Sequence, residues 1–397
     1  MKLTSKEQNE ALALLRELIK IPSGYFDEEN IMNFTKMVAQ NYNLPAKLHR
    51  YSFKPLEFEG LNLYGLIEGE GGPLIYLGGH LDTVHLASGW TKPPLGATLE
   101  EGRLYGTGAL DMKAGCAAIL YTLKLFLRDY PKFNGKILYH FASVEEGPYG
   151  LGTTFFIKDI LKQVPDFALI AEPSSALAEL DNASISLGAK GGYNYKVYLK
   201  GLSTHAATPE MGISAAEDAA KLVLELNHVE TLEDPLLGKG ASCVIALHSA
   251  SGACSVPDEA EIEVFRHCVP GESMATIEAE IHDAIARAEL KCSYTIAFRE
   301  PPAQGFDGGF PPYTTDKNNP YVQRLETILK EEIGKEPAYT SSKAIGDFNL
   351  IGGVLGVPTV LYGPRGENIH SADEYVTIST YYETIHVLYE FLKKSLT

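Results

Sequence analysis

Short apolar runs bounded by glycine and proline alternate with amphipathic stretches along the first half of the chain. Periodicity predicts helices near 4–19, 28–42 and 152–163, and strands near 46–52, 62–67, 74–79, 136–144 and 167–171. Residues 113–129 are apolar on almost every side, so we expect a buried helix there. This alternation is typical of an α/β fold with a mostly parallel sheet.

The pattern changes after residue 186. Residues 187–299 read as strand, helix, strand, strand, helix, strand, at 193–199, 213–227, 242–248, 259–267, 272–290 and 293–298. That order is typical of a ferredoxin-like α+β domain. Alternation then returns with a helix at 319–334, a strand at 359–361 and a helix at 378–393. We therefore expect an α/β domain, built from 1–186 and 300–397, interrupted by an inserted α+β domain at 187–299.

Composition narrows the class of protein. A length of 397 residues favours two domains, and 45% hydrophobic with 21% charged residues is ordinary for a globular protein. The start of the chain lacks the apolar core of a signal peptide, no run of residues is suited to span a membrane, and the five scattered cysteines suggest reduced thiols. We expect a cytoplasmic protein. Its net charge of −17 argues against nucleic acid or a membrane surface as a partner.

Three of the apolar runs end in residues that bind metals. Residues 74–77 lead through two glycines to His80, residues 136–144 stop at Glu145 and Glu146, and residues 167–171 stop at Glu172. In open α/β sheets, functional groups gather beyond the carboxyl ends of the strands. The sequence therefore predicts a metal site at one edge of the sheet.

Two aspartates extend this set. Asp82 lies two residues after His80, where its carboxylate can accept the second ring N–H of a metal-bound histidine; the alternative is an ordinary turn aspartate. Asp111 follows Gly106 and Gly108 at the start of the buried helix. An N-cap role is the alternative there, and it is compatible with metal binding.

The adjacent residues Glu145 and Glu146 can have different chemical roles. Adjacent carboxylates near a closed site repel each other unless a cation compensates. One of them can bind a metal while the other faces a water molecule as a general base. His370 lies in a Gly/Pro-rich loop after the strand at 359–361 and approaches the same edge. Two exposed turn glutamates and a structural histidine are the alternatives.

Six segments together carry a family resemblance. They are HLDTV, GALDMKAG, VEEG, AEPSS, HAATPEMG and NIHSADEYV, at 80–84, 108–115, 144–147, 171–175, 205–212 and 368–376. In these motifs and their order the chain resembles the zinc-dependent amidohydrolase and exopeptidase family of aminoacylase, acetylornithine deacetylase, succinyl-diaminopimelate desuccinylase and glutamate carboxypeptidase. The resemblance covers essentially the whole chain. It implies a zinc-exopeptidase catalytic domain with the insert as a lid and dimerisation domain.

The resemblance also implies the roles of individual residues. Two zinc ions are expected, one held by His80 and Glu172 and the other by Glu146 and His370, with Asp111 bridging them. Glu145 is implied as the general base, Asp82 as the group that orients His80, and the peptide bond after Asp111 as cis. Mixed nitrogen and oxygen ligands also accept Co²⁺ or Mn²⁺. A bound water of lowered pKa would supply hydroxide.

Two residues of the expected lid also have implied roles. His205 would reach the active site of a partner subunit and stabilise the oxyanion, which implies a homodimer through the lids. Arg266 would bind the carboxylate of the substrate, although the family's preceding Asn is absent from Ala253-Cys254-Ser255 and its acid two places before the arginine is Val264. The expected substrate is a small peptide or N-acyl amino acid, cleaved beside a free carboxylate by an exopeptidase, dipeptidase or deacylase. The alternative is a non-catalytic metal-binding relative with the same fold.

Overall fold

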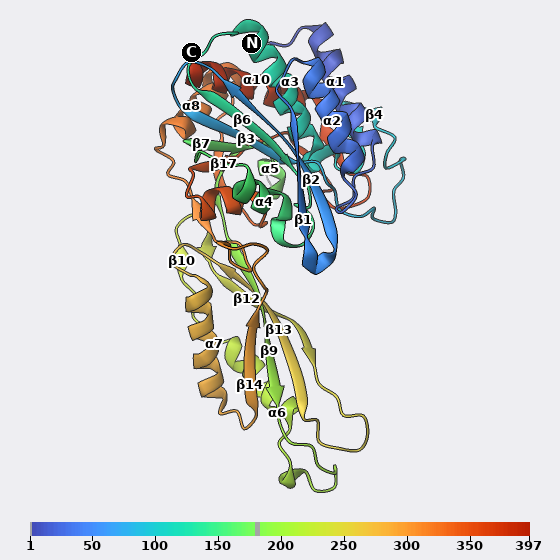
Figure 1. The fold of residues 1–397 in the computed structure, drawn as a ribbon, viewed down its shortest axis with the longest axis vertical. Helices are drawn as coiled ribbons and strands as arrows, with labels where there is room; N and C mark the ends of the chain where they lie inside the picture. Colours follow the sequence, from blue (N-terminus) through green and yellow to red (C-terminus); the bar gives the residue numbers. More distant parts are fainter. Residues whose placement is uncertain (1, 179–182) are drawn as a thin grey trace. The chain divides into compact units, whose positions relative to one another are not determined.

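The computed structural model describes residues 2–178 and 183–397 and forms two compact units (Figure 1). The first unit contains residues 1–189 and 314–397, and the inserted unit contains residues 190–313. The first junction lies three residues after the expected position, whereas the second lies well beyond residue 299. The reason is that the chain after residue 299 still packs on the inserted unit, where the main chains of Gly192 and Phe310 exchange hydrogen bonds of 2.9 Å.

A mixed, mostly parallel sheet forms the centre of the first unit, in the strand order β1-β2-β6-β3-β7-β17-β8, with β16 also beside β8 and the short β15, Tyr313–Thr314, next to β8 at the edge. The strands β6, β3, β7 and β17 run parallel to one another, while β1 and β2 are antiparallel. This confirms the expected fold class. The bounds are β1 Lys47–Phe53, β2 Phe58–Glu68, β3 Leu74–His80, β6 Lys136–Ala142, β7 Phe167–Ile170, β8 Ser184–Ala189, β16 Ala338–Ser342 and β17 Thr359–Leu361.

A small second sheet has the order β18-β19-β5-β4 and joins two distant parts of the first unit. Its strand β19 pairs with β5, so that residues 103–105 lie beside residues 375–377. The bounds are β4 Thr98–Glu100, β5 Arg103–Tyr105, β18 Gly366–Glu367 and β19 Tyr375–Thr377.

Helices cover both faces of the central sheet (Figure 1). A side chain added at Gly79 of β3 would meet Met112 and Cys116, so that face of the sheet lies against α3. His140 of β6 points to the other face and stacks on Phe156 of α4 with 3.9 Å between ring centroids. The bounds are α1 Ser5–Lys20, α2 Glu29–Asn41, α3 Ala114–Asp129, α4 Leu151–Asp159, α5 Ser174–Leu177, α8 Pro320–Ile328, α9 Asp347–Asn349 and α10 Ile378–Leu396, with short helical turns at 54–56, 109–113, 148–150, 329–333 and 350–354.

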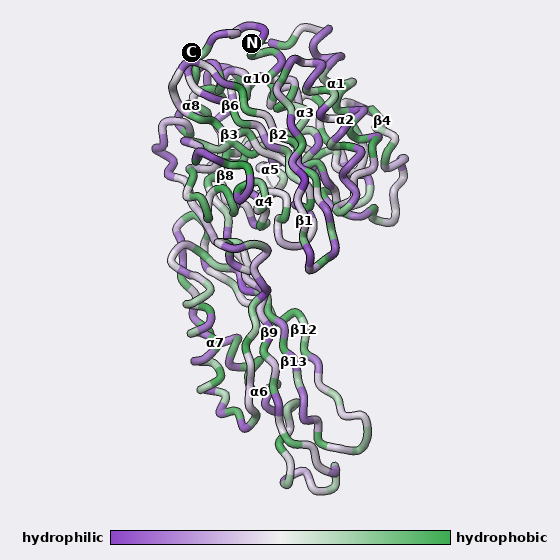
Figure 2. Tube along the Cα trace, viewed as in Figure 1, coloured by the Kyte–Doolittle hydropathy of each residue, from purple (hydrophilic) through white to green (hydrophobic). Residues whose placement is uncertain are grey.

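Local sequence explains where these helices begin and which ones are buried. Thr4 and Glu7 form a capping box at the start of α1, since Thr4 N donates to Glu7 Oε2 at 2.7 Å and Glu7 N donates to Thr4 Oγ1 at 3.3 Å. The apolar helix expected at 113–129 is α3, and twelve of its sixteen residues are buried. Figure 2 shows the hydrophobic positions along α3 and the central strands.

The inserted unit has the predicted ferredoxin-like topology. Its antiparallel sheet has the order β12-β13-β9-β14, and α6 and α7 pack on one face, where Val197, Ile262 and Leu222 belong to the core. The bounds are β9 Gly191–Lys200, α6 Ala215–Leu226, β10 Glu233–Asp234, β11 Gly238–Lys239, β12 Ala241–His248, β13 Glu259–Cys268, α7 Met274–Ala288 and β14 Ser293–Phe298, with a helical turn at 209–211 and the short β15, Tyr313–Thr314, at the junction.

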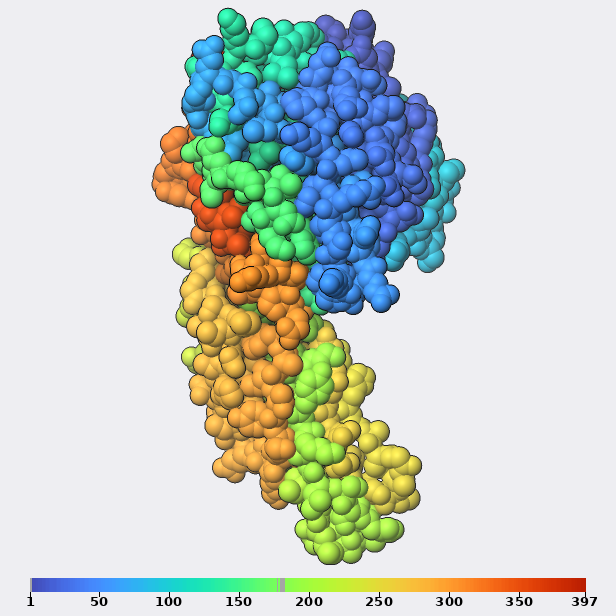
Figure 3. Space-filling model, viewed as in Figure 1, coloured from blue at the N-terminus to red at the C-terminus, as the bar shows by residue number. Residues whose placement is uncertain are grey.

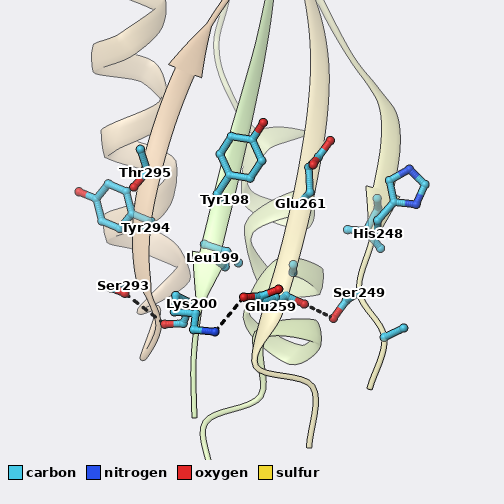
Figure 4. A pocket seen from close by; sticks show the side chains of 13 residues that line it. Tyr198, Leu199, Lys200, His248, Ser249, Glu259, Glu261, Ser293, Tyr294 and Thr295 are labelled. Carbon is cyan, nitrogen blue, oxygen red and sulfur yellow. Dashed lines mark hydrogen bonds and ion pairs between the residues drawn. The ribbon is translucent and has the colours of Figure 1, made fainter. Parts of the chain in front are cut away.

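The remaining face of this sheet is polar and accessible. Lys196 Nζ pairs with Glu261 Oε1 at 2.6 Å across neighbouring strands, and Tyr198 is exposed beside them. An open groove of about 740 Å³ crosses the strands beside Tyr198, Lys200 and Glu259, which are labelled in Figure 4. Strand β12 forms one edge of the sheet and presents Ile245, 53% exposed, and Leu247, 48% exposed.

No helix within residues 2–178 and 183–397 has both the length and the apolar composition needed to cross a membrane. The five cysteines are free, as expected from their scattered positions. Three of them are buried, at Cys116, Cys268 and Cys292.

Candidate metal centre

The central sheet brings the predicted ligands to one edge. His80 is the last residue of β3, Glu145 and Glu146 follow β6, and Glu172 follows β7. Because β6, β3 and β7 are parallel neighbours, their carboxyl ends meet. Asp111 reaches the same place from the turn before α3.

Asp111 lies between two separate pairs of ligand groups. Its Oδ1 is 3.3 Å from His80 Nε2, which is itself 3.6 Å from Glu172 Oε1. Its Oδ2 is 3.4 Å from His370 Nε2, which is 2.8 Å from Glu146 Oε1. The five predicted ligands therefore form two groups, here called half-sites, that share the carboxylate of Asp111. Each half-site contains one imidazole and one glutamate in addition to Asp111.

Asp82 holds residues of both half-sites. The ring nitrogen Nδ1 of His80 lies 3.0 Å from the main-chain oxygen of Asp82 and 3.6 Å from its Oδ1. The nearest acceptor is thus the carbonyl rather than the expected carboxylate, and a proton on Nδ1 leaves Nε2 to bind a metal. Asp82 Oδ2 accepts a hydrogen bond of 2.9 Å from Glu146 N. The peptide bond after Asp111 is cis, as expected.

Glu145 lies beside these half-sites. Its Oε2 is 3.8 Å from His80 Nε2, and its Oε1 accepts a hydrogen bond of 3.1 Å from Asp347 N. Burial, followed by the charges of neighbouring carboxylates such as Asp347 and Glu146, raises the pKa of Glu145 well above its usual value. A carboxyl group of raised pKa is suited to accept and return a proton.

The electrostatics of the cluster favour a bound cation. Burial lowers the pKa of His80, but Glu145, Asp111 and Glu172 outweigh it and raise that pKa well above the usual value. Hydrogen bonds to Asp111 and Glu146 raise the pKa of His370 to about 10. The cluster thus attracts positive charge.

The donor set fits zinc. Asp111 Oδ1 is buried and has no hydrogen-bond partner among the described residues. Ligand atoms of His80, Asp111 and Glu146 lie within 4.8 Å of one another. Imidazole nitrogen and carboxylate oxygen are ordinary zinc ligands, and the two histidines and three carboxylates suffice for a pair of ions.

Two carboxylate residues that were not predicted as site residues, the buried Glu28 and the half-buried Asp347, lie next to Glu145. Glu28 Oε1 accepts hydrogen bonds of 3.0 Å from both Phe26 N and Val144 N. Asp347 links its own segment to α4, because Thr153 donates its hydroxyl proton to Asp347 Oδ2. Glu28 lies in no motif that indicates chemistry. The segment Gly346-Asp347-Phe348-Asn349 resembles that of deacylases acting on acylated lysine or ornithine, and this weak resemblance was the only signal for Asp347.

His205 lies in the inserted unit, on the exposed segment that follows β9, seen in yellow-green in Figure 3. Its Nδ1 accepts a hydrogen bond of 3.0 Å from Ala207 N. In the neutral ring the proton is then on Nε2, which makes this atom a hydrogen-bond donor.

Arg266, predicted to bind a substrate carboxylate, lies in the core of the inserted unit with 1% of its side chain exposed. Its Nη2 donates to Glu272 Oε1 at 2.6 Å and Glu280 Oε1 at 3.0 Å, its Nε donates to Glu280 Oε2 at 3.1 Å, and its Nη1 donates to His267 O. The guanidinium is therefore committed to structural ion pairs. The predicted substrate clamp at Arg266 has no support in this arrangement.

Comparisons with known proteins agree with this geometry. The profile of peptidase family M20/M25/M40 matches residues 76–394. A succinyl-diaminopimelate desuccinylase of Hydrogenovibrio crunogenus is 26% identical over 359 residues, which cover 87% of this chain and 92% of the relative.

Solved structures share the fold over almost the full chain. A tripeptidase of Staphylococcus aureus superposes with a TM-score of 0.78 at 23% identity, covering 98% of both chains. A dinuclear metal-binding peptidase of the M20 family from Bacillus subtilis superposes with a TM-score of 0.71 at 15% identity, again covering 98% of both chains.

Proposed function

Because the chain belongs to peptidase family M20/M25/M40, a family of metallopeptidases and amidohydrolases, we propose that it hydrolyses an amide bond beside a free carboxylate with two zinc ions. The observation that carries this proposal is the position of Asp111. Its two oxygens face two different imidazole–glutamate pairs, which is the arrangement that a bridging ligand requires. Zinc bound there would polarise the scissile carbonyl and acidify a water molecule.

Glu145 is the residue proposed to move protons. It lies next to the half-site of His80 and Glu172, and Asp347 N fixes its Oε1 so that Oε2 faces the cluster. In the proposed reaction Glu145 takes one proton from the attacking water and delivers it to the leaving nitrogen. The C–N bond breaks as the new C–O bond is retained, and the remaining hydroxyl proton passes to the amine, so that the products are a carboxylate and a protonated amine.

The proposed substrates are small peptides or N-acyl amino acids. The support comes from the relatives, which include a succinyl-diaminopimelate desuccinylase and, among similar folds, a tripeptidase. Both of these names describe hydrolysis of an amide in a small molecule. Since Arg266 is engaged by Glu272 and Glu280, recognition of the substrate carboxylate is assigned to other groups.

We also propose a homodimer formed through the inserted unit, with His205 donating from Nε2 to the oxyanion in the partner's site. The support is the exposed edge strand β12, whose Ile245 and Leu247 are about half exposed. Edge strands with exposed apolar side chains readily pair with another chain. The open face beside this edge is visible in Figure 4.

The decisive experiment compares the zinc-loaded protein with its Glu145→Gln variant on N-acetyl and N-succinyl amino acids and on dipeptides. We expect amine release that requires zinc, and a loss of about 10²–10⁴-fold in kcat for the variant with two ions still bound. The exposed Glu70→Gln is the control and should retain full activity. Full activity of Glu145→Gln, or no hydrolysis of any substrate by the loaded wild type, would contradict the proposal.

A further inference from the structure

One buried carboxylate contacts the main chain that presents Asp111. Gly108 has a left-handed backbone with φ of 70°, and Asp111 has a non-helical φ of −114° and ψ of 97°. Three N–H groups of this turn donate hydrogen bonds to the carboxylate of Glu374, which is 3% exposed. Gly108 N is 2.8 Å from Glu374 Oε2, while Leu110 N and Asp111 N are 2.7 Å and 3.0 Å from Oε1.

Glu374 belongs to the segment that carries His370. The main chain strengthens this connection, because Gly106 N donates to Glu374 O at 3.0 Å and β19 pairs with β5 directly afterwards. Asp373 fixes the same segment from the other side by accepting hydrogen bonds of 2.9 Å from Thr91 N and 2.7 Å from Thr91 Oγ1. Two remote parts of the chain, 263 residues apart at Asp111 and Glu374, are thereby joined at the metal centre.

The backbone of this segment adopts a conformation that is uncommon for residues other than glycine. Asn368, His370 and Asp373 all have left-handed φ values, of 67°, 58° and 58°. Asn, Asp and His adopt this conformation more readily than other side chains do, and contacts with the surrounding structure help to hold it. The distance of 3.4 Å between His370 Nε2 and Asp111 Oδ2 therefore depends on contacts between the two segments.

We propose that Glu374 is a positioning residue for the metal centre, and that its carboxylate sets the spacing of Asp111 and His370. This inference rests on the proposed function, since it presumes that these residues bind metal. The half-site of Glu146 and His370 should depend on Glu374 most, because His370 and Asp111 both contribute to it. Residues that orient metal ligands commonly change affinity by about 10–100-fold when they are replaced.

Lys113 attaches the other side of the same turn to α1. Its Nζ donates to Leu18 O at 3.1 Å and Ile21 O at 2.9 Å, and its side chain runs beside Gly108. The turn is thus held from two sides, by Lys113 and by Glu374. Loss of Glu374 should therefore displace Asp111 without unfolding the first unit.

The test measures metal binding rather than turnover. The metal-free wild type, Glu374→Ala and Glu374→Gln are titrated with Zn²⁺ against a competing chelator, and the visible spectrum of bound Co²⁺ reports ligand geometry. We expect Glu374→Ala to bind one of the two ions about tenfold or more weakly, with an altered Co²⁺ spectrum. Glu374→Gln keeps the shape of the side chain but has one acceptor oxygen in place of two. Its affinity for zinc should therefore fall less than that of Glu374→Ala.

The matched control is Asp218→Asn in the inserted unit. Asp218 is also buried, at 2% exposed, and its Oδ2 accepts hydrogen bonds of 2.6 Å from Lys291 N and 2.8 Å from Cys292 N. Its loss should lower Tm and leave zinc affinity unchanged. Wild-type affinity and spectrum in both folded Glu374 variants would overturn the positioning role alone. A wild type that binds fewer than one ion would overturn the proposed function and this role together.

Discussion

At the scale of single residues, the most unusual feature is the number of buried carboxylates around the candidate metal centre. An isolated buried carboxylate is costly, and here main-chain N–H groups compensate for part of that cost. Glu28, Asp82 and Glu374 each accept at least one such hydrogen bond from residues next to a proposed ligand or to Glu145. These carboxylates orient the main chain that carries the chemistry.

The buried carboxyl group of Glu28 gives the stability of the protein a measurable pH dependence. Burial, followed by the charge of Asp82, raises the pKa of Glu28 from its ordinary 4.5 to about 8. The folded protein therefore binds this proton more tightly than the unfolded chain does. The contribution of Glu28 to stability is complete below pH 4.5 and is lost as the pH rises towards 8.

Glu28→Gln removes this titration. We compare the Tm of the two metal-free proteins as variant minus wild type. This difference should increase between pH 5 and pH 8, by about 2–4 °C for each kcal/mol of stability that the wild type loses over that range. Calorimetry or circular dichroism of the two proteins measures it. The exposed Glu70→Gln should show a difference that does not change with pH. A Glu28→Gln difference that decreases with pH would contradict the assignment.

At the scale of elements, the end of β7 is packed against two glycines. A side chain at Gly115 of α3 would lie 2.1 Å from Ala171 O, and one at Gly363, just after β17, would lie 2.4 Å from the same atom. Helix α3 and β17 therefore approach the residue before Glu172 as closely as main chains can. The position of this proposed ligand depends on close packing of three elements.

Gly115→Ala separates packing from helix propensity. Alanine generally stabilises a helix by about 1 kcal/mol relative to glycine, whereas overpacking at this contact costs about 1–3 kcal/mol. We expect the contact to dominate, so that Tm falls and zinc binds more weakly at the half-site of His80 and Glu172. Titration with zinc and thermal unfolding check both effects.

Gly252→Ala, where an added side chain meets nothing within 4 Å, should change neither property. A higher Tm with unchanged zinc affinity in Gly115→Ala would show that the contact relaxes freely.

At the scale of the whole molecule, the proposed dimer gives the inserted unit a part in the reaction. In that proposed dimer, the exposed His205 contacts the oxyanion at the site of the partner subunit. Mixing two inactive variants distinguishes this arrangement from one in which each chain works alone.

Glu145→Gln and His205→Ala should each be nearly inactive, and a refolded equal mixture should recover up to about one quarter of wild-type activity. That value follows because half of the dimers are mixed and each of these has one complete site. Ile245→Lys should abolish both the dimer and the recovery, as seen by sedimentation, while the exposed Met37→Lys should leave them intact. A mixture no more active than its components would exclude the shared site.

Regular patterns allowed much of this architecture to be predicted. The parallel strands β3, β6 and β7 were found from apolar runs, and the inserted unit from its order of helices and strands. Strands β8 and β16 were not predicted, because their sequences mix small polar and apolar residues and each is stabilised by the other across about 150 residues of chain. Helix 319–334 was found, although its α-helical part ends at Ile328.

The sequence alone determined the fold class, the family resemblance and the residue types available as ligands, because hydrophobic periodicity and motif order are local properties of the chain. Only the tertiary structure decided which atoms face one another. Asp111 lies between two half-sites, and Arg266 is turned into a core where Glu272 and Glu280 hold its guanidinium. Glu374 contacts the turn of Asp111 across most of the chain. Such contacts depend on packing between distant segments, and no local pattern records them.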